Sequence, residues 1–413
     1  HTLLWKPPEY TLLEPIWGSG LITSSGPKWH QRRRMLTPAF HFTILQSYLN
    51  VFNSQAKTMI NILDEFADGN ETIDLLPYLR RFSMDTISET AMGVSVNAQK
   101  GENHDFYMAI TRIFELLFKN LRYPWLWAKP IWYMLGYGFE FDRHVNVVKK
   151  LVTKVIAKRT VEFESLERKP TFEELSIGGK KKLTFLDLLL SMGKEHKLTD
   201  ADIAEEVGTF LVAGYDTISS SIGFVLFLLG HKQHIQDKVY EELYEIFGES
   251  DRGITVDDLR RMKYLNQCMK ESIRMYPTVV MIGRRITEDT VIGDYTIPAG
   301  VTVSISPFAV ARDPEQWKDP EIYDPDRFAP DNSIGRDPFA FLPFSAGPRN
   351  CLGQKFAIME EKVALASILR KYRIISMITE EENRALPEVS LKPSRGFPIR
   401  LQRRLQRYTS SSA

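Results

Sequence analysis

A single cysteine near the C-terminal end of the chain lies in a stretch whose residue types could bind a reactive metal. Cys351 follows the run Phe-Ser-Ala-Gly-Pro-Arg-Asn at 344–350, which contains turn-forming residues. From Gln354 to about Arg370, apolar residues recur at roughly helical spacing. Cys351 is therefore expected at a turn-to-helix junction, where the partial positive charge of the helix start favours a thiolate over a thiol.

Two neighbours of this cysteine extend the argument. Gly347 lets the backbone turn and approach a large flat group closely, and Arg349 can meet an anionic part of the same group. A thiolate, an anion partner and a close backbone together describe a haem iron ligated by cysteine. The alternative is a buried cysteine at a helix start, which is the commoner fate of a free cysteine.

The spacing of five residues in this stretch resembles a known motif. Phe344, Gly347, Arg349, Cys351 and Gly353 occupy every fixed position of Phe-x-x-Gly-x-Arg-x-Cys-x-Gly, the haem-binding loop of the cytochrome P-450 superfamily. The resemblance implies that these residues bind haem b and that the cysteine ligates its iron. It also implies a mainly α fold with a small β region, in which a long central helix crosses over the haem.

A long helix is expected upstream of this loop. Thr199-x-x-Asp202 is close to a capping box, and the helix that it opens runs to about Gly230, roughly 30 residues or ~45 Å. Its segment Val207–Gly230 is apolar enough to suggest a membrane span. Asp216 at its centre would be costly in lipid, so we interpret it as a buried helix of a soluble fold.

The middle of this helix reads Ala213-Gly214-Tyr215-Asp216-Thr217. A glycine inside a helix costs ~1 kcal/mol relative to alanine, and such local violations tend to mark function. The acid and the hydroxyl could form a proton relay that serves bound oxygen. The pentapeptide resembles the family motif (Ala/Gly)-Gly-x-(Asp/Glu)-Thr, which implies oxygen activation by Asp216 and Thr217 and contact of Ala213 and Gly214 with the haem.

The residue before this glycine departs from a pattern within the family. Many fatty-acid ω-hydroxylases carry a glutamate there, which can form an ester with the haem. Ala213 cannot form that bond, so we predict haem held without a covalent protein link. The same departure weakens any expectation of oxidation at a terminal carbon.

Trp29 and Arg33 are four residues apart and share one face of a predicted helix. The alternative is a solvated basic turn, because three arginines are adjacent here. The family uses Trp-x-x-x-Arg to hold a haem propionate, and the resemblance assigns that role to Trp29 and Arg33. Arg32, Arg34 and Lys28 are then candidates for a basic face that docks an acidic redox partner.

Glu271 and Arg274 lie three apart in a helix expected over Tyr264–Tyr276. On their own they would form a surface ion pair of less than ~1 kcal/mol. The resemblance instead implies a buried structural triad completed by Arg327, which stands in a Pro-x-Arg-Phe match. Its expected role is to hold the loop around Cys351.

The residues after this helix could face a substrate. Their apolar character suits a hydrocarbon, and core packing is the alternative; they are Val279, Val280, Met281 and Ile282. Arg284 is the expected second propionate partner, with Arg285 as the alternative. Short hairpins are predicted within 292–305, and a strand pair within Glu388–Arg400 with its turn at 397–398.

Length and composition are those of an ordinary globular protein. The chain has 413 residues, 43% hydrophobic and 25% charged, with formal net charge +1, so nothing favours nucleic-acid binding. Two cysteines, Cys268 and Cys351, exclude a disulfide framework. We expect a linker at 169–182, one domain at 1–402 and a polar, disordered tail at 403–413. Compared with the resembled family, the N-terminal part with its membrane anchor is missing.

The resemblance covers essentially the whole chain, and the string Glu89–Gln99 resembles the animal microsomal family that includes fatty-acid ω-hydroxylases. It implies a monooxygenase that inserts one atom of O₂ into a fatty acid or another lipid-like compound. Its electrons would come from an NADPH-dependent flavin reductase, with a cytochrome b-type protein as a second donor. The expected location is the cytosolic face of the endoplasmic reticulum membrane, reached through an N-terminal anchor absent from this chain.

Two other functions use the same cysteine loop. A haem-thiolate isomerase or dehydratase needs no external electrons, and a non-catalytic haem-binding protein needs no proton delivery. The pair Asp216–Thr217 favours oxygen activation over both.

Overall fold

Helices make up most of the computed structural model, which describes residues 4–165, 184–195 and 198–404. The predicted linker at 169–182 and most of the predicted tail lie outside these residues. The longer helices are α2 (Gly26–Leu36), α3 (Phe42–Leu63), α4 (Leu76–Thr90), α5 (His104–Arg122), α7 (Tyr137–Glu164), α9 (Phe185–Glu195), α10 (Asp200–His231), α11 (Gln233–Phe247), α13 (Lys263–Met275) and α15 (Gln354–Lys371). Shorter ones are α1 (Glu14–Trp17), α6 (Lys129–Met134), α12 (Val256–Arg261) and α14 (Pro307–Val310).

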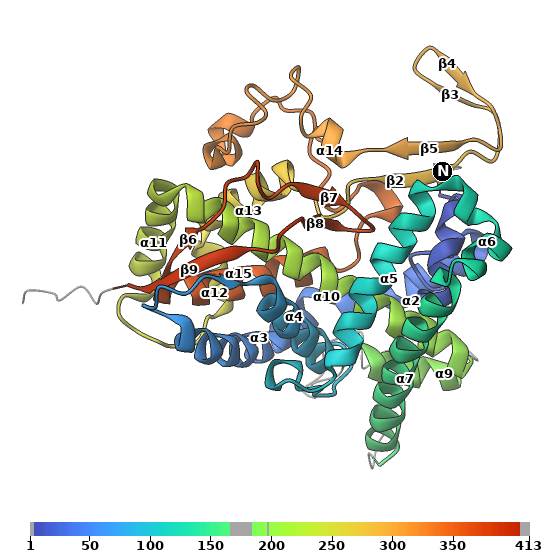
Figure 1. Ribbon diagram of the computed structural model, residues 1–413, viewed down its shortest axis with the longest axis horizontal. Helices are drawn as coiled ribbons and strands as arrows, with labels where there is room; N and C mark the ends of the chain where they lie inside the picture. The colour runs from blue at the N-terminus through green and yellow to red at the C-terminus, as the bar shows by residue number, and fades with distance from the viewer. Residues whose placement is uncertain (1–3, 166–183, 196–197, 405–413) are drawn as a thin grey trace, which may run out of the picture.

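The strands form small antiparallel sheets. The largest described sheet has the order β1-β9-β6, with β1 at Ile73–Asp74, β6 at Tyr372–Ser376 and β9 at Pro398–Arg403. Two-stranded sheets pair β2 (Ile282–Arg285) with β5 (Thr302–Ile305), β3 (Thr290–Ile292) with β4 (Tyr295–Ile297), and β7 (Ala385–Pro387) with β8 (Leu391–Pro393). The predicted fold class, mainly α with a small β region, is confirmed (Figure 1).

The strand pair predicted within Glu388–Arg400, with its turn at 397–398, is wrong in both its partners and its turn. Residues 388–390 form the turn between β7 and β8, whereas Pro398 begins β9, which pairs with β6 and β1. Proline lacks the N–H that a central strand needs, but it fits the first position of a strand. Ile399 and Leu401, two residues apart, are buried on one face of β9.

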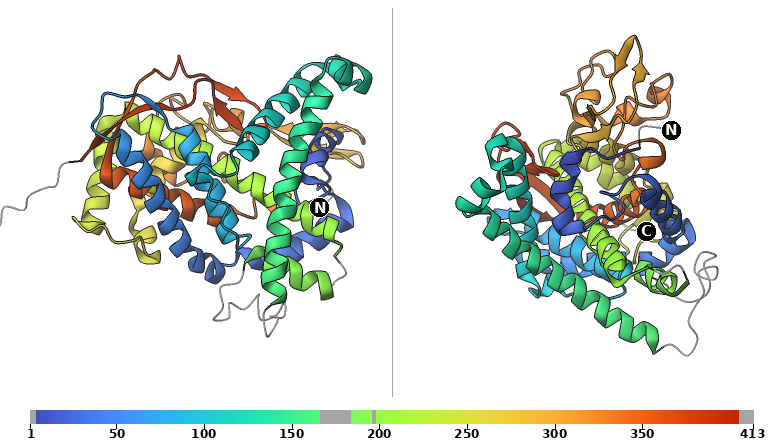
Figure 2. Two further views of the ribbon diagram at one scale, coloured as in Figure 1. Left: turned by 60° about the horizontal axis from the view of Figure 1, so that its bottom comes forward. Right: turned by 90° about the vertical axis from the view of Figure 1, so that its right-hand side faces the viewer.

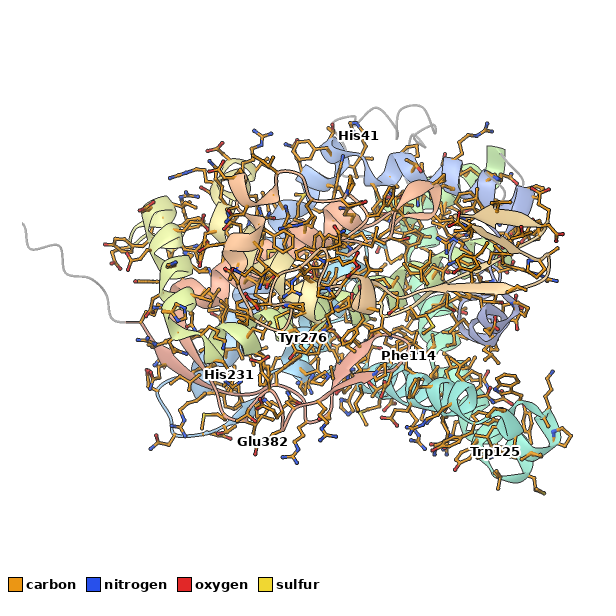
Figure 3. The ribbon with its side chains drawn as sticks, turned by 90° about the horizontal axis from the view of Figure 1, so that it is seen from above. His41, Phe114, Trp125, His231, Tyr276 and Glu382 are labelled. Atoms are coloured by element: carbon orange, nitrogen blue, oxygen red, sulfur yellow. The ribbon has the colours of Figure 1, made fainter. Side chains whose placement is uncertain are left out.

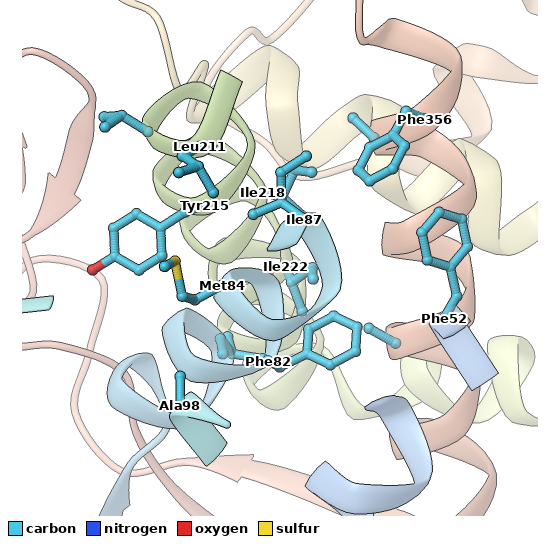
Figure 4. Close-up of a cluster of buried hydrophobic side chains, with 14 of the residues drawn as sticks. Phe52, Phe82, Met84, Ile87, Ala98, Leu211, Tyr215, Ile218, Ile222 and Phe356 are labelled. Atoms are coloured by element: carbon cyan, nitrogen blue, oxygen red, sulfur yellow. The ribbon is translucent and has the colours of Figure 1, made fainter. Parts of the chain in front are cut away.

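Helix α10 is the central element of the fold. Thr199 and Asp202 form the predicted capping box at its start. By length and composition α10 is the one described helix that could span a membrane, but 83% of its most apolar window is buried inside the protein. It crosses the middle of the molecule and packs against α4 (Figures 1 and 4). The interpretation as a buried helix is confirmed.

A glycine sets the spacing between α10 and α4. A Cβ on Gly214 would lie 2.9 Å from side-chain atoms of Ile87, closer than an ordinary contact, so glycine allows the two helices to approach. Ile87, Ile218 and Ile222 pack together in the core that these helices share (Figure 4). Helices α5, α6 and α7 lie at the end of the molecule opposite to β6 and β9 (Figures 1 and 2).

Candidate active site

A cavity of about 320 Å³ lies between α10 and the loop that precedes α15. Residues far apart in the sequence line it, from Lys6 and Tyr10 near the N-terminus to Phe356 and Ala357 in α15. Its volume falls within the range of small-molecule and cofactor sites. Most of the predicted cofactor residues line it: Trp29, Arg33, Ala213, Gly214, Arg284, Phe344, Arg349, Cys351 and Gly353.

The thiol of Cys351 faces this cavity and is exposed there, although protein surrounds its other sides. The loop is fixed by a hydrogen bond from the Cys351 N–H to the carbonyl of Phe344, 2.9 Å long. Gly353 caps α15, which begins at Gln354. Cys351 therefore lies at the predicted turn-to-helix junction.

The expectation that the helix start favours a thiolate at Cys351 is wrong for the cysteine without a bound metal ion. Burial raises the pKa of Cys351, and the backbone N–H of Gly353 and the charge of Arg33 offset only part of that rise. Loss of hydration disfavours the charged form more than the helix start favours it, since the sulfur lies three residues before the first helical residue. A bound metal ion would deprotonate the thiol outright.

Arg349 fastens the cysteine loop to the N-terminal part of the chain. Its guanidinium donates hydrogen bonds to the carbonyls of Leu4 (3.0 Å), Leu21 (3.3 Å) and Ser24 (2.6 Å). It also lies 4.0 Å from the ring centre of Trp29, in cation–π contact. Arg349 and Trp29 are thus bound to each other as well as lining the cavity.

Arg33 holds the residue next to the cysteine. It donates to the main-chain oxygen of Asn350 at 2.8 Å and to the side-chain oxygen of the same residue at 2.6 Å. Because Trp29 and Arg33 lie one helical turn apart in α2, this helix supports both Arg349 and Asn350.

The predicted basic docking face is largely wrong. Arg32 is buried and pairs with Asp202, and Lys28 donates to Glu205 at 2.8 Å. Lys28 and Arg32 are four residues apart and therefore share the face of α2 that meets Asp202 and Glu205 in the first turns of α10. Of this set, only Arg34 is exposed.

A cluster of cations at the cavity indicates what group the site would accept. Burial and the nearby charges of Arg284 and Arg349 hold the pKa of Lys6 well below its usual range. Burial and the charge of Arg284 lower the pKa of Arg349 to about 9. In the described part of the chain, neither these three cations nor Arg33 forms an ion pair with a carboxylate. Buried like charges are unfavourable without an anion, so the cluster fits the two propionates of a haem.

Helix α10 supplies a different part of the lining. Ala213, Gly214 and Thr217 face the cavity, and the Thr217 hydroxyl donates to the carbonyl of Ala213 at 2.7 Å. Asp216 is not among the lining residues. It is 2% exposed and contacts residues behind α10.

The three residues of the predicted structural triad lie together. Glu271 and Arg274, both fully buried, form a two-pronged pair at 2.7 and 2.8 Å, and the Nε of Arg327 lies 3.3 Å from Glu271. The Asp324 N–H also donates to Glu271 at 3.0 Å. The triad joins α13 to the segment 324–328.

The remaining predicted residues divide. Val279 and Ile282 line the cavity, whereas Val280 and Met281 do not, and Met281 is 58% exposed. Successive residues of an extended segment point to opposite sides. Strict alternation would place Val279 and Met281 on the same side, but only Val279 of these two lines the cavity. Arg284 lines the cavity and Arg285 is exposed outside it. Gly347 has a φ of +68° and turns the loop without contributing to the lining.

Sequence reasoning missed several residues that surround the site. Lys6 and Tyr10 line the cavity from a segment without helical or strand periodicity. Arg80, Ser390 and Lys392 surround Asp216 from elements distant in sequence. The one sequence signal for Lys392 is that a lysine interrupts a short apolar stretch expected to form a strand.

The comparisons with known proteins agree with this geometry. A sequence model of the family described as Cytochrome P450 matches residues 5–399. Cytochrome P450 4V2 of Mus musculus is 41% identical over 96% of this chain and 76% of its own length, and the Homo sapiens protein of that name is 40% identical. Cytochrome P450 4c3 of Drosophila melanogaster is 38% identical over 96% of this chain.

A solved structure has the same architecture. The crystal structure of the cytochrome P450DA heme domain superposes with a TM-score of 0.82 at 26% sequence identity, and the match covers 97% of this chain and 83% of that one. Membership of such a family implies a haem-thiolate cofactor, and the cavity between the cysteine loop and α10 is the candidate site for it. The chain belongs to the cytochrome P450 family, and within it to family 4.

Proposed function

We propose that this cytochrome P450 oxidises a fatty acid or another lipid-like compound with electrons from an NADPH-dependent flavin reductase. The observation that carries the proposal is the composition of the cavity. Apolar side chains surround a thiol and a hydroxyl there, among them Ile22, Phe40, Ile87, Phe210, Ile218, Val279, Ile282 and Phe356. Such a lining binds a hydrocarbon by removing its surface from water, at roughly 25 cal/mol per Å².

Different residues of the cavity would bind the iron, the propionates and the oxygen. Cys351 would ligate the haem iron, and Lys6, Arg33, Arg284 and Arg349 would hold its propionates. When bound, the haem supplies the activation of O₂, and thiolate ligation favours cleavage of the O–O bond. Thr217 offers a hydroxyl that can donate a hydrogen bond inside the cavity, with Asp216 next to it in the chain.

Two alternatives keep the cysteine loop. A haem-thiolate isomerase or dehydratase would release a product without oxygen from O₂, and a haem carrier would release none. The hydroxyl of Thr217 at the cavity favours a monooxygenase over both, because neither alternative needs a proton delivered to bound oxygen.

We propose a location at the cytosolic face of the endoplasmic reticulum membrane, where a cytochrome b-type protein could act as a second electron donor. An exposed apolar cluster supports contact with lipid: Trp125 and Trp127 are each 60% exposed, Phe139 is 68% and Met134 is 78% exposed. Trp125 lies at the outer end formed by η5 (Pro124–Trp127) and α6 (Figure 3). Exposed tryptophans with neighbouring lysines and arginines suit a membrane surface.

Turnover with labelled oxygen tests the proposal. The purified chain, loaded with haem and given NADPH, a flavin reductase, ¹⁸O₂ and dodecanoic acid as the probe, should form a hydroxylated acid containing one ¹⁸O atom. A rearranged or dehydrated product without ¹⁸O would favour the first alternative. Haem binding without any product from a panel of fatty acids and neutral lipids would favour the second.

The haem should be removable without breaking a bond to the protein. Because Ala213 stands where a glutamate could form an ester, acid–acetone extraction should move all haem into the organic phase and leave colourless protein. The matched variant Ala213→Glu should retain part of its haem after turnover. Acid-stable haem in the wild-type chain would contradict the non-covalent prediction.

A further inference from the structure

Thr209 of α10 is a buried threonine that lines the cavity. It is 1% exposed, and among the described residues its hydroxyl oxygen Oγ1 has no hydrogen-bond partner. A buried hydroxyl without a partner is unfavourable, because it has given up its hydrogen bonds to water. A ligand that bonds to this hydroxyl inside the cavity would therefore gain affinity.

Thr209 belongs to the face of α10 that borders the cavity. Thr209, Ala213 and Thr217 follow one another at intervals of four residues, and all three line the cavity. Thr209 precedes Thr217 by two helical turns, or roughly 12 Å along the helix axis. Unlike the Thr217 hydroxyl, which donates to the carbonyl of Ala213, that of Thr209 remains available to a ligand. A lipid that bonds to Thr209 through a polar group can thus place another part of its chain beside Thr217.

A glycine in the facing loop leaves room for this hydroxyl. A Cβ on Gly20 would lie 2.5 Å from Thr209 Oγ1 and 3.1 Å from the carbonyl oxygen of Glu205. A larger residue at position 20 would therefore displace the Thr209 side chain. The next two residues of the loop, Leu21 and Ile22, line the cavity with apolar side chains. The hydroxyl thus lies at the edge of an apolar region, where a hydrogen bond to a ligand competes little with water.

The charges near Thr209 indicate what kind of group it would bind. Glu205 and Glu206 precede it by about one turn of the same helix. The cations that face these acids are already paired with them, because Lys28 donates to Glu205 at 2.8 Å and the Nε of Arg32 lies 3.7 Å from Glu206. A carboxylate beside Thr209 would therefore lie near two acids whose cations are already engaged. An uncharged oxygen fits this position better.

We propose that the Thr209 hydroxyl binds an uncharged oxygen of the substrate, such as that of a fatty alcohol. The inference rests on the proposed lipid oxidation and narrows its substrate class. The hydrocarbon part of the molecule lies against the apolar lining, and its oxygen bonds to Thr209. A threonine hydroxyl can accept a hydrogen bond from an alcohol and can donate one to its oxygen. Thr209 is thus a positioning residue, since this bond determines which part of the chain lies beside Thr217.

Three ligands of one chain length separate this hydrogen bond from apolar contact. Octan-1-ol, octane and octanoate are titrated into the haem-loaded chain, and each dissociation constant is read from the change in the absorption spectrum of the ferric haem. The quantity compared is the ratio of the dissociation constant of a variant to that of the wild type. Valine has nearly the shape of threonine but lacks the hydroxyl. Thr209→Val should therefore weaken octan-1-ol about fivefold and leave octane and octanoate unchanged.

Two further variants provide matched controls. Thr209→Ser keeps the hydroxyl, so its ratio for octan-1-ol should exceed its ratio for octane by less than about twofold. Thr86 of α4 is fully buried, and its hydroxyl also has no partner among the described residues, but it does not line the cavity. Thr86→Val should leave the binding of all three ligands unchanged. If Thr209→Val does not take up haem, Thr209→Ala replaces it, and its ratio for octane corrects for the lost methyl group.

Each result decides the inference. An unchanged affinity for octan-1-ol in Thr209→Val would overturn it, and so would an equal loss for octan-1-ol and octane, because the hydroxyl would then matter only for packing. A loss confined to octanoate would overturn the preference for an uncharged oxygen. The titration needs neither reductase nor O₂, which keeps the two proposals apart. Octan-1-ol bound through Thr209 by a chain that forms no ¹⁸O product would refute the monooxygenase alone, whereas an ¹⁸O product with unchanged affinities would refute the role of Thr209 alone.

Discussion

Replacing Cys351 with serine should abolish the red-shifted Soret band of the reduced, carbon-monoxide-bound protein and lower reductase-driven turnover to background. Serine has nearly the size of cysteine, and the backbone hydrogen bond from residue 351 to Phe344 does not involve the side chain. The variant should therefore fold with its loop in place. It loses the thiolate, which is the ligand that would donate electron density to the haem iron.

The other cysteine provides the control for this experiment. Cys268 is fully buried in α13, and burial raises the pKa of its thiol, so it is a structural residue with no access to the cavity. Cys268→Ser should keep the Soret band and the turnover. A thiolate-type band in Cys351→Ser would contradict the assignment of the ligand. A loss of the band in both variants would indicate that the assay reports folding and not ligation.

Glu271→Gln should lower the free energy of unfolding by ~3–5 kcal/mol, because it leaves buried cations without their carboxylate. Arg274 is fully buried and Arg327 lies 3.3 Å from the same acid. The carbonyl oxygen of the glutamine amide can still accept hydrogen bonds, but the neutral amide cannot balance either charge. Denaturant unfolding of the haem-loaded protein, followed by circular dichroism, measures the loss.

An exposed pair serves as the reference for the triad. Arg403 and Asp68 lie 2.9 Å apart with side chains 46% and 49% exposed, so Asp68→Asn should cost no more than ~1 kcal/mol. If Glu271→Gln costs as little as this control, the triad is not the structural element that it is taken to be. Haem loss at lower denaturant than global unfolding would show that the triad acts chiefly on the cysteine loop.

The parts of the site that the sequence predicts are those carried by local spacing. Cys351 lies at its turn-to-helix junction, Thr199 and Asp202 cap α10, and Glu271 and Arg274 face each other one helical turn apart. In each case the residues that interact are within a few positions of one another. Helical geometry alone brings them together.

The parts that could not be predicted depend on partners far along the chain. Arg32 looks like one member of a basic run, and its partner Asp202 lies 170 residues later. Asp216 looks like a cavity acid, but Lys392, 176 residues away, turns its carboxylate to the outside of α10. The rotation of a side chain around a helix follows from what packs there, which no local pattern contains. The same holds for Lys6, whose role follows from Arg284 and Arg349.

The fastening of Arg349 to Leu4, across 345 residues, sets an order of events during synthesis. Bringing such distant segments together carries a large loop-closure cost, and contacts of this separation form late in folding. The residues of the cavity wall near Lys6 are synthesised before residues 342–357, which line the opposite side. They therefore lack their contacts with Arg349 until that later part of the chain has been made. The pocket can therefore take up its cofactor only after translation has passed residue 357, as one of the last steps of maturation.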